Sequence, residues 1–226
     1  MFVAKWWFFD AGMVETSVPE IVTENGRRYA RLSLHTWSTN TIARIYKMDD
    51  YFETMWDVDS FVPKSFVAKI RESHATRDKR MSFDHERGTV EVVTNNESPK
   101  EFPIKPMTQD FFSASFLTRM EPLAPKTTFL APLFEDNKNY DARIYSIKKE
   151  RIPVLDGQLD TVMIIGRLGF EGAFDNGHNL YIWLSDDAQH VPVKLEMGFA
   201  WGSVVLHLAK AEGVDLKIVR PEKKAE

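Results

Sequence analysis

The sequence contains no cysteine, so disulfide bonds, thiolate nucleophiles and metal centres that need cysteine ligands are excluded. Its six histidines are scattered, and no two have the spacing of metal ligands, so we expect no metal and no cofactor. Long apolar runs are also missing, since no stretch approaches the roughly 20 residues of a transmembrane helix. The chain of 226 residues is nevertheless large enough to bury a core without covalent crosslinks.

Surplus positive charge is absent as well. The chain has 29 Lys and Arg residues against 33 Asp and Glu residues, which gives a formal net charge of −4. Nucleic acids and anionic membranes attract proteins through surplus positive charge, so this balance argues against nonspecific binding to either partner. The hydrophobic share of 43% and the charged share of 27% are those of an ordinary soluble globular protein.

Familiar catalytic and nucleotide-binding motifs are not found. There is no phosphate-binding Walker sequence and no G-x-S-x-G nucleophile turn. Gly166, Gly169 and Gly172 recur every third residue, which is not the dinucleotide-binding spacing. The acidic stretch 135–141 lacks the glycine and the final glutamate of a calcium-binding loop, so we interpret it as a solvated loop.

The dominant hydrophobic period is two, which is typical of β-strands. In one example, Tyr140, Ala142 and Ile144 alternate with Asp141 and Arg143. Turn signals separate such segments, at Asn25-Gly26, 84–88, Asp156-Gly157 and Asn176-Gly177. We predict a mainly β fold of roughly ten strands, in which a curved antiparallel sheet forms an open or incomplete β-barrel similar to lipocalins or lipoprotein carriers.

Two segments have helical spacing instead. Residues 40–47 are the weaker candidate, and residues 108–120 the stronger one. In the stronger helix, Thr108 is the expected N-cap, and Asp110 lies near the positive end of the helix dipole. We expect this helix to pack against the concave side of the sheet. Residues 1–212 are predicted to form one domain, with 213–226 as a last short strand and charged tail.

Aromatic residues are plentiful, with 16 Phe, 6 Trp and 6 Tyr. Near the N-terminus, one predicted strand carries Trp6 and Phe8 on one face and Trp7 and Phe9 on the other. A strand that is apolar on both faces needs cover on both, from the helix, a partner or an apolar ligand. The candidate ligand-binding residues are Trp6, Phe8, Trp37, Trp56, Phe111, Phe112, Trp183 and Trp201.

A set of short motifs, in order along the chain, resembles a bacterial family. The motifs are Asp10-Ala11-Gly12, Gln109-Asp110 followed by Ser113-Ala114, Trp183-Leu184-Ser185-Asp186-Asp187, Val191-Pro192-Val193 and Gly202-Ser203. In order and spacing they resemble the family called domain of unknown function 3108, over nearly the whole chain. The motif residues are Gly12, Asp110, Ser113, Asp186, Asp187, Pro192 and Gly202. One departure is Phe111-Phe112, where the family more often has smaller or aliphatic residues.

The resemblance implies an exported envelope protein of a Gram-negative bacterium, with an open barrel of the kind that carries lipids or lipoproteins. It implies no catalytic residue, because the family has no assigned reaction. By this analogy we expect the protein in the periplasm or at the periphery of the outer membrane. Composition alone is equally compatible with the cytoplasm.

Three functional hypotheses follow. The first is a non-enzymatic protein that holds a lipid or another apolar ligand in the mouth of the barrel. The second is an interaction module that meets an envelope protein partner through exposed aromatic side chains. The third is a hydrolase-type enzyme that uses Asp110 with a distant histidine, which requires Asp110 to lie in a cleft beside a titratable partner.

Overall fold

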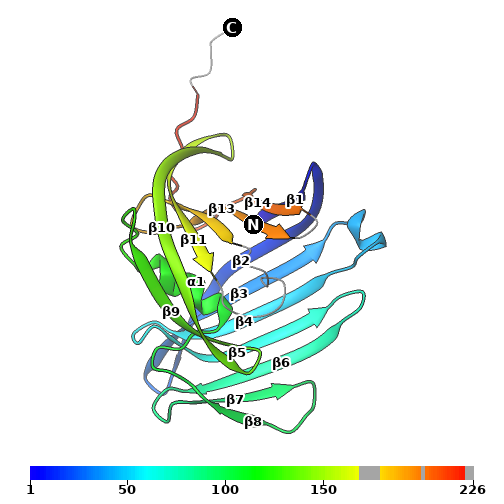
Figure 1. The fold of residues 1–226 in the computed structure, drawn as a ribbon, viewed down its shortest axis with the longest axis vertical. Helices are drawn as coiled ribbons and strands as arrows, with labels where there is room; N and C mark the ends of the chain where they lie inside the picture. The colour runs from blue at the N-terminus through cyan, green and yellow to red at the C-terminus, as the bar shows by residue number, and fades with distance from the viewer. Residues whose placement is uncertain (168–178, 200–201, 222–226) are drawn as a thin grey trace.

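The computed structural model describes residues 1–167, 179–199 and 202–221. In these ranges the chain forms one antiparallel sheet, a single α-helix and a short 3-10 helix (Figure 1). The elements are β1 (Phe2–Trp6), β2 (Phe9–Glu24), β3 (Arg27–Ser38), η1 (Ile42–Arg44), β4 (Asp49–Asp57), β5 (Val62–Arg71), β6 (Thr76–Asp84), β7 (Thr89–Thr94), β8 (Lys100–Pro103), α1 (Phe111–Arg119), β9 (Thr128–Glu135), β10 (Lys138–Val154), β11 (Gly157–Arg167), β12 (Leu180–Ser185), β13 (Pro192–Phe199) and β14 (Gly202–Leu208).

The sheet curls strongly but does not close through hydrogen bonds. Its 14 strands among the described residues follow the order β8-β7-β6-β5-β4-β3-β2-β1-β14-β13-β12-β11-β10-β9. The first and last strands of the chain therefore pair at the middle of the sheet, while β8 and β9 form its two edges. The predicted fold class, a curved antiparallel sheet in an incomplete barrel, is confirmed; the prediction of roughly ten strands is too low.

Tight turns set the register of the hairpins. Asn25 has a φ of 51° and Gly26 a φ of 79°, so the predicted Asn-Gly turn is confirmed. Asp136 and Asn137 have φ values of 47° and 61° and join β9 to β10. The acidic stretch 135–141, which we interpreted as a solvated loop, is therefore the end of β9, a two-residue turn and the start of β10. The predicted turn Asn176-Gly177 lies outside the described residues.

Helix α1 begins later than predicted. Asp110, and not Thr108, is the N-cap, because its carboxylate accepts hydrogen bonds from the backbone N–H groups of Phe112 and Ser113. Thr108 instead donates from its hydroxyl to the carbonyl of Lys105, at 2.7 Å. The second predicted helix, at 40–47, is wrong apart from the 3-10 turn η1. None of the helices among the described residues is long and apolar enough to cross a membrane.

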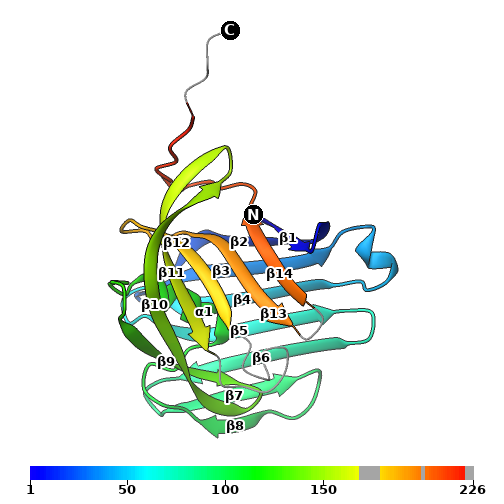
Figure 2. The ribbon, with the colours of Figure 1, turned by 45° about the horizontal axis from the view of Figure 1, so that its top comes forward.

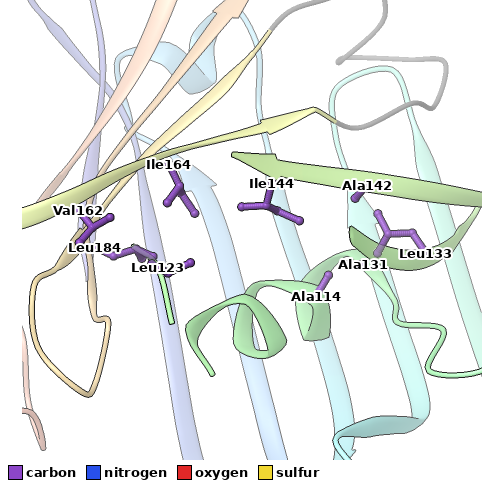
Figure 3. Close-up of a cluster of buried hydrophobic side chains, with 9 residues drawn as sticks. All are labelled: Ala114, Leu123, Ala131, Leu133, Ala142, Ile144, Val162, Ile164 and Leu184. Carbon is purple, nitrogen blue, oxygen red and sulfur yellow. The ribbon is translucent and has the colours of Figure 1, made fainter. Parts of the chain in front are cut away.

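Helix α1 fills the concave side of the sheet. It contacts β9 on one side and β3 and β4 on the other, and the two ribbon views agree with this placement (Figures 1 and 2). On the first side, Ala114 faces Ala131, Ala142 and Ile144 of β9 and β10 (Figure 3). The three alanines among them allow the helix to approach the sheet closely. On the second side, Phe112 packs in one cluster with strand residues of β3 and β4.

Side chains and one loop residue bridge the gap between the sheet edges. The backbone of Gln109 pairs with β9, since its N–H donates to Pro132 and its carbonyl accepts from Phe134. Lys79 on β6 forms a buried ion pair with Glu135 at the end of β9, at 2.6 Å. The edge strand β9 is therefore covered, which removes an open template for strand addition. Phe134 itself is fully buried.

The predicted last strand is not formed in the described part of the C-terminal segment. Residues 213–221 contain only an isolated bridge, between Gln158 and Val219. Arg220 adds an ion pair with Asp156, at 2.7 Å. The segment thus lies beside the β10–β11 hairpin without extending the sheet.

Candidate functional site: an exposed aromatic rim

The N-terminal aromatic residues form a hairpin tip and not one strand. Strand β1 ends at Trp6 and β2 begins at Phe9, and these two residues are paired. Trp7 and Phe8 are the two turn residues between them, and Trp7 has a φ of 58°. The predicted strand with two apolar faces is therefore wrong, because the chain reverses direction where that strand would need to continue.

The tip exposes three consecutive aromatic side chains. Trp7 is 73% exposed, Phe8 74% and Phe9 51%. The rings of Phe8 and Phe9 lie with their centroids 4.2 Å apart, so the two side chains form one apolar surface. Trp6, at the end of β1, is half-buried. Such a group of aromatic side chains in water is unusual, since large apolar side chains normally lose most of their exposure on folding.

The loop between β3 and β4 lies beside this tip. The backbone N–H of Thr39 donates to the carbonyl of Ala11, at 3.0 Å, and its hydroxyl donates to the carbonyl of Asp10, at 2.9 Å. The loop then exposes Ile45, of which 82% is accessible to solvent. Figures 1 and 2 both show η1 and the dark-blue β1–β2 tip at the same end of the sheet. We call the four residues Trp7, Phe8, Phe9 and Ile45 the aromatic rim.

Hydrogen bonds hold the β3–β4 loop in place. The N–H of Lys47 donates to the hydroxyl of Ser73, at 2.8 Å, in the neighbouring β5–β6 turn. The Tyr46 hydroxyl donates to the Glu72 carboxylate, at 2.6 Å, and this bond is the main reason that the pKa of Tyr46 rises to about 12. The loop that carries Ile45 is therefore preorganised in its exposed position.

Positive charges flank the aromatic rim. Arg44 and Lys47 are exposed, and neither forms an ion pair with another described residue. The nearest acid to the tip, Asp10, is neutralised by Lys5 at 3.2 Å. Carboxylates lie near the same loop, since Glu72 accepts the hydrogen bond of Tyr46 and Asp49 follows Lys47 by two residues, so the surroundings of the rim contain charges of both signs.

Three of the other candidate ligand-binding residues belong to the packed interior. Trp56 is 6% exposed, and its ring N–H donates to the side chain of Gln109 at 3.3 Å. Phe111 makes an edge-on contact with the ring of Phe52, at 5.2 Å between centroids. Phe112 is also 6% exposed. Trp56 and Phe112 are therefore used in packing the helix against the sheet, and Phe111, which is half-buried, joins the same aromatic contacts.

The remaining candidates do not converge on one place. Trp183 is buried in a separate cluster, where its ring N–H donates to Glu150 at 2.8 Å and Lys194 lies 4.0 Å above the ring. Trp37 is half-buried and contacts His35, at 4.5 Å between ring centroids. Trp201 lies outside the described residues. Only Phe8 of the candidate set lies on the aromatic rim, with Trp6 beside it.

Two shallow depressions in the described surface lie away from the helix. One, of about 530 Å³, lies between the β10–β11 hairpin and the C-terminal segment. The other, of about 600 Å³, lies at the barrel end opposite the aromatic rim and includes Lys64, His85 and Glu86. No residue of α1 lines either one. Neither has the enclosed apolar walls of a site for an acyl chain.

Asp110 is used for structure. It is completely buried and accepts hydrogen bonds from the N–H groups of Phe112 and Ser113 and from the hydroxyl of Thr54. Burial raises the pKa of its carboxyl to about 6, against the opposing effect of those hydrogen bonds. Its partners are helix and strand groups and include no histidine, so Asp110 does not meet the requirement of the hydrolase hypothesis. The described residues also contain no cluster of three His, Asp or Glu side chains that could hold a metal ion.

The other motif residues have structural positions. Gly12 lies where an added Cβ would be 2.7 Å from the Trp37 carbonyl oxygen, so only glycine fits without distortion. Asp187 accepts from the Ser185 hydroxyl and the Gln189 N–H, and closes the β12–β13 turn. Three further motif residues frame strands or turns: Asp186 pairs with Lys149, Pro192 begins β13, and Gly202 begins β14 with a φ of 127°.

Comparisons with known proteins agree with this architecture. Among solved structures, the chain is similar to a β-barrel-like protein of the domain of unknown function DUF1849 from Brucella abortus. The TM-score is 0.56 and the identity 15%, over 88% of this chain and 86% of that chain, so the likeness shows the fold alone. No match was found among curated proteins. A family model described as "Protein of unknown function (DUF3108)" matches residues 2–209, and the chain therefore belongs to that family, as its ordered motifs predicted.

Proposed function

We propose that the protein is a non-catalytic docking protein of the cell envelope and that the aromatic rim is its working surface. The observation that carries the proposal is the contrast between interior and rim. Inside the barrel, helix α1 packs against β3, β4 and β9, and Phe112 and Trp56 are 6% exposed. At the rim, Trp7 and Phe8 are more than 70% exposed. Aromatic anchors of this kind dominate the energy of many binding surfaces.

Binding of an apolar ligand inside the barrel is less well supported. A carrier needs an apolar cavity, and the concave side of this sheet is occupied by α1. Releasing the helix would expose the buried carboxyl of Asp110 and break its hydrogen bonds with the Thr54 hydroxyl on β4. Native mass spectrometry of gently purified protein tests this alternative. Detection of a lipid in stoichiometric amount would support the carrier function over the docking function.

An envelope location is part of the proposal. The family resemblance supports it, because that resemblance implies an exported protein of the cell envelope. Cell fractionation of the native host, with an antibody against this chain, provides the measurement. We expect the protein in the periplasmic or membrane-associated fraction. Detection only in the cytoplasmic fraction would contradict the envelope part of the proposal.

Photo-crosslinking in cells tests the docking surface directly. A photoreactive phenylalanine analogue replaces Phe8 in the full chain, and a second protein carries it at Leu155, which is also exposed at a hairpin tip but lies away from the rim. We expect crosslinked products from position 8 well above those from position 155. Equal yields from the two positions would refute docking through the rim, whatever the partner.

A further inference from the structure

We propose that the aromatic rim inserts into the interfacial region of a phospholipid bilayer. This inference rests on the proposed docking function and names its partner as a lipid surface. The rim is convex, since it consists of a hairpin tip and the adjacent loop at one end of the sheet (Figures 1 and 2). A protein partner needs a matching pocket for such a tip, whereas a bilayer adapts to it.

The residue types of the rim suit the headgroup region. Trp and other aromatic side chains favour the boundary between headgroups and acyl chains. There the apolar part of the ring contacts acyl chains, and polar atoms such as the indole N–H contact headgroups or water. Trp7, Phe8 and Phe9 are consecutive and exposed; the rings of Phe8 and Phe9 lie together, and the indole of Trp7 lies beside Gly202 at the start of β14. Ile45, at 82% exposed, adds an aliphatic side chain from the neighbouring loop. Shallow insertion of this kind resembles that of interfacial anchors.

The backbone at the tip is also unfavourable. Trp7 has a φ of 58°, in the left-handed region that favours Gly and Asn and disfavours bulky side chains. At the turn between β2 and β3, the positions with positive φ are occupied by Asn25 and Gly26, which adopt this conformation readily. A tryptophan at such a position is costly for folding. Phe61, with a φ of 59°, and Leu155, with a φ of 52°, have the same type of backbone conformation, so the tip is distinguished by the exposure of three consecutive aromatic side chains in addition to this conformation.

We expect the charges around the rim to contribute less to the affinity for a bilayer than the aromatic side chains do. Arg44 and Lys47 can approach anionic headgroups without giving up an ion pair within the described residues. Each cation near an anionic surface strengthens binding roughly fivefold. The net charge of −4 opposes long-range attraction to such a surface, so we expect the aromatic side chains to provide most of the affinity. Binding to neutral bilayers should therefore be measurable, and anionic lipid should increase it moderately.

Co-sedimentation with lipid vesicles tests this inference on the full chain. The vesicles contain phosphatidylcholine, with or without phosphatidylglycerol. The first variant combines Trp7→Asn with Phe8→Ser, which keeps residues suited to a turn, and Leu155→Asn is the matched control at another exposed tip. We expect wild type and the control to bind both vesicles, and the double variant to bind at least tenfold more weakly. Arg44→Gln with Lys47→Gln should remove only the increase due to phosphatidylglycerol.

The outcomes separate this inference from the proposed function. Circular dichroism first establishes that the double variant is folded. Wild-type protein that does not sediment with either vesicle, or a double variant that sediments equally well, overturns the inference. If position 8 then crosslinks to a protein in cells, the docking function stands and its partner is that protein. If position 8 gives no specific crosslink either, both proposals fail.

Discussion

Replacing Asp110 with asparagine should stabilise the protein at neutral pH. The carboxyl is fully buried, and burial raises its pKa from 3.8 to about 6. The folded state therefore holds this proton more tightly than the unfolded state does. The stability due to this group is complete below pH 3.8 and is lost as the pH rises through 6. A difference of about two pKa units corresponds to roughly 3 kcal/mol between the two limits.

Asparagine keeps the geometry of the cap while removing the charge. Its side-chain oxygen can accept from the N–H groups of Phe112 and Ser113, and asparagine is as good an N-cap as aspartate. Its amide group can donate to the hydroxyl of Thr54, which rotates to accept. We expect Asp110→Asn to match wild type at pH 4 and to exceed it by up to about 3 kcal/mol at pH 8.

Urea denaturation at a series of pH values measures this difference. The comparison of the two proteins cancels the contributions of the other acids, which both share. Asp110→Ala is the contrasting variant, because it leaves three buried donors without an acceptor and should cost about 3 kcal/mol or more. If Asp110→Asn is less stable than wild type at pH 8 and keeps the same pH dependence, then desolvation does not dominate at this site and the reasoning is wrong.

Three further predictions concern the packing of the barrel, and equilibrium unfolding in urea measures each. Gly12→Ala should lose about 2 kcal/mol, because its Cβ would be 2.7 Å from a backbone oxygen, whereas Gly166→Ala, with neighbours at 3.9 Å, should be nearly neutral. Equal losses would contradict this. Phe134→Ala should cost about 3–5 kcal/mol through the cavity it leaves, and an unchanged stability would show that the bridge between the sheet edges is not packed. Lys79→Met should cost about 3 kcal/mol by leaving Glu135 buried without its partner, and adding Glu135→Leu should restore much of it. No recovery in the double variant would mean that the ion pair is not the cause.

The sequence was sufficient to predict the architecture because its local signals agree with one another. Alternation with a period of two marked β10 and its neighbours, and Asn25-Gly26 marked a hairpin whose positive φ values the structure confirms. Helical spacing between two flanking prolines predicted the position of α1. The same pattern did not identify its N-cap. Thr108 and Asp110 are both good caps in isolation, and burial against Thr54 decided between them. That choice depends on a contact 56 residues away in sequence, which local patterns do not contain.

The candidate site was harder to predict because its turn violates the usual turn chemistry. The sequence Trp6-Trp7-Phe8-Phe9 has the composition of a buried strand and no glycine, proline or asparagine. Hydrophobicity alone therefore predicted a continuous strand with two apolar faces. One signal favoured a turn, namely the opposite charges of Lys5 and Asp10, which pair across the hairpin.

The failure of that prediction is itself informative about function. At the β2–β3 turn the chain has Asn and Gly at positive φ, whereas Trp7, like Phe61 and Leu155, is a large side chain in that conformation. The tip instead combines an unfavourable backbone conformation with 73% exposure of the largest side chain in proteins. Both features oppose stability, and the contact of the Trp7 indole with Gly202 at the start of β14 offsets only part of this cost. Local rules are broken in this way mainly at functional sites, and this is why the rim, and not the well-packed interior, is the place to look for a partner.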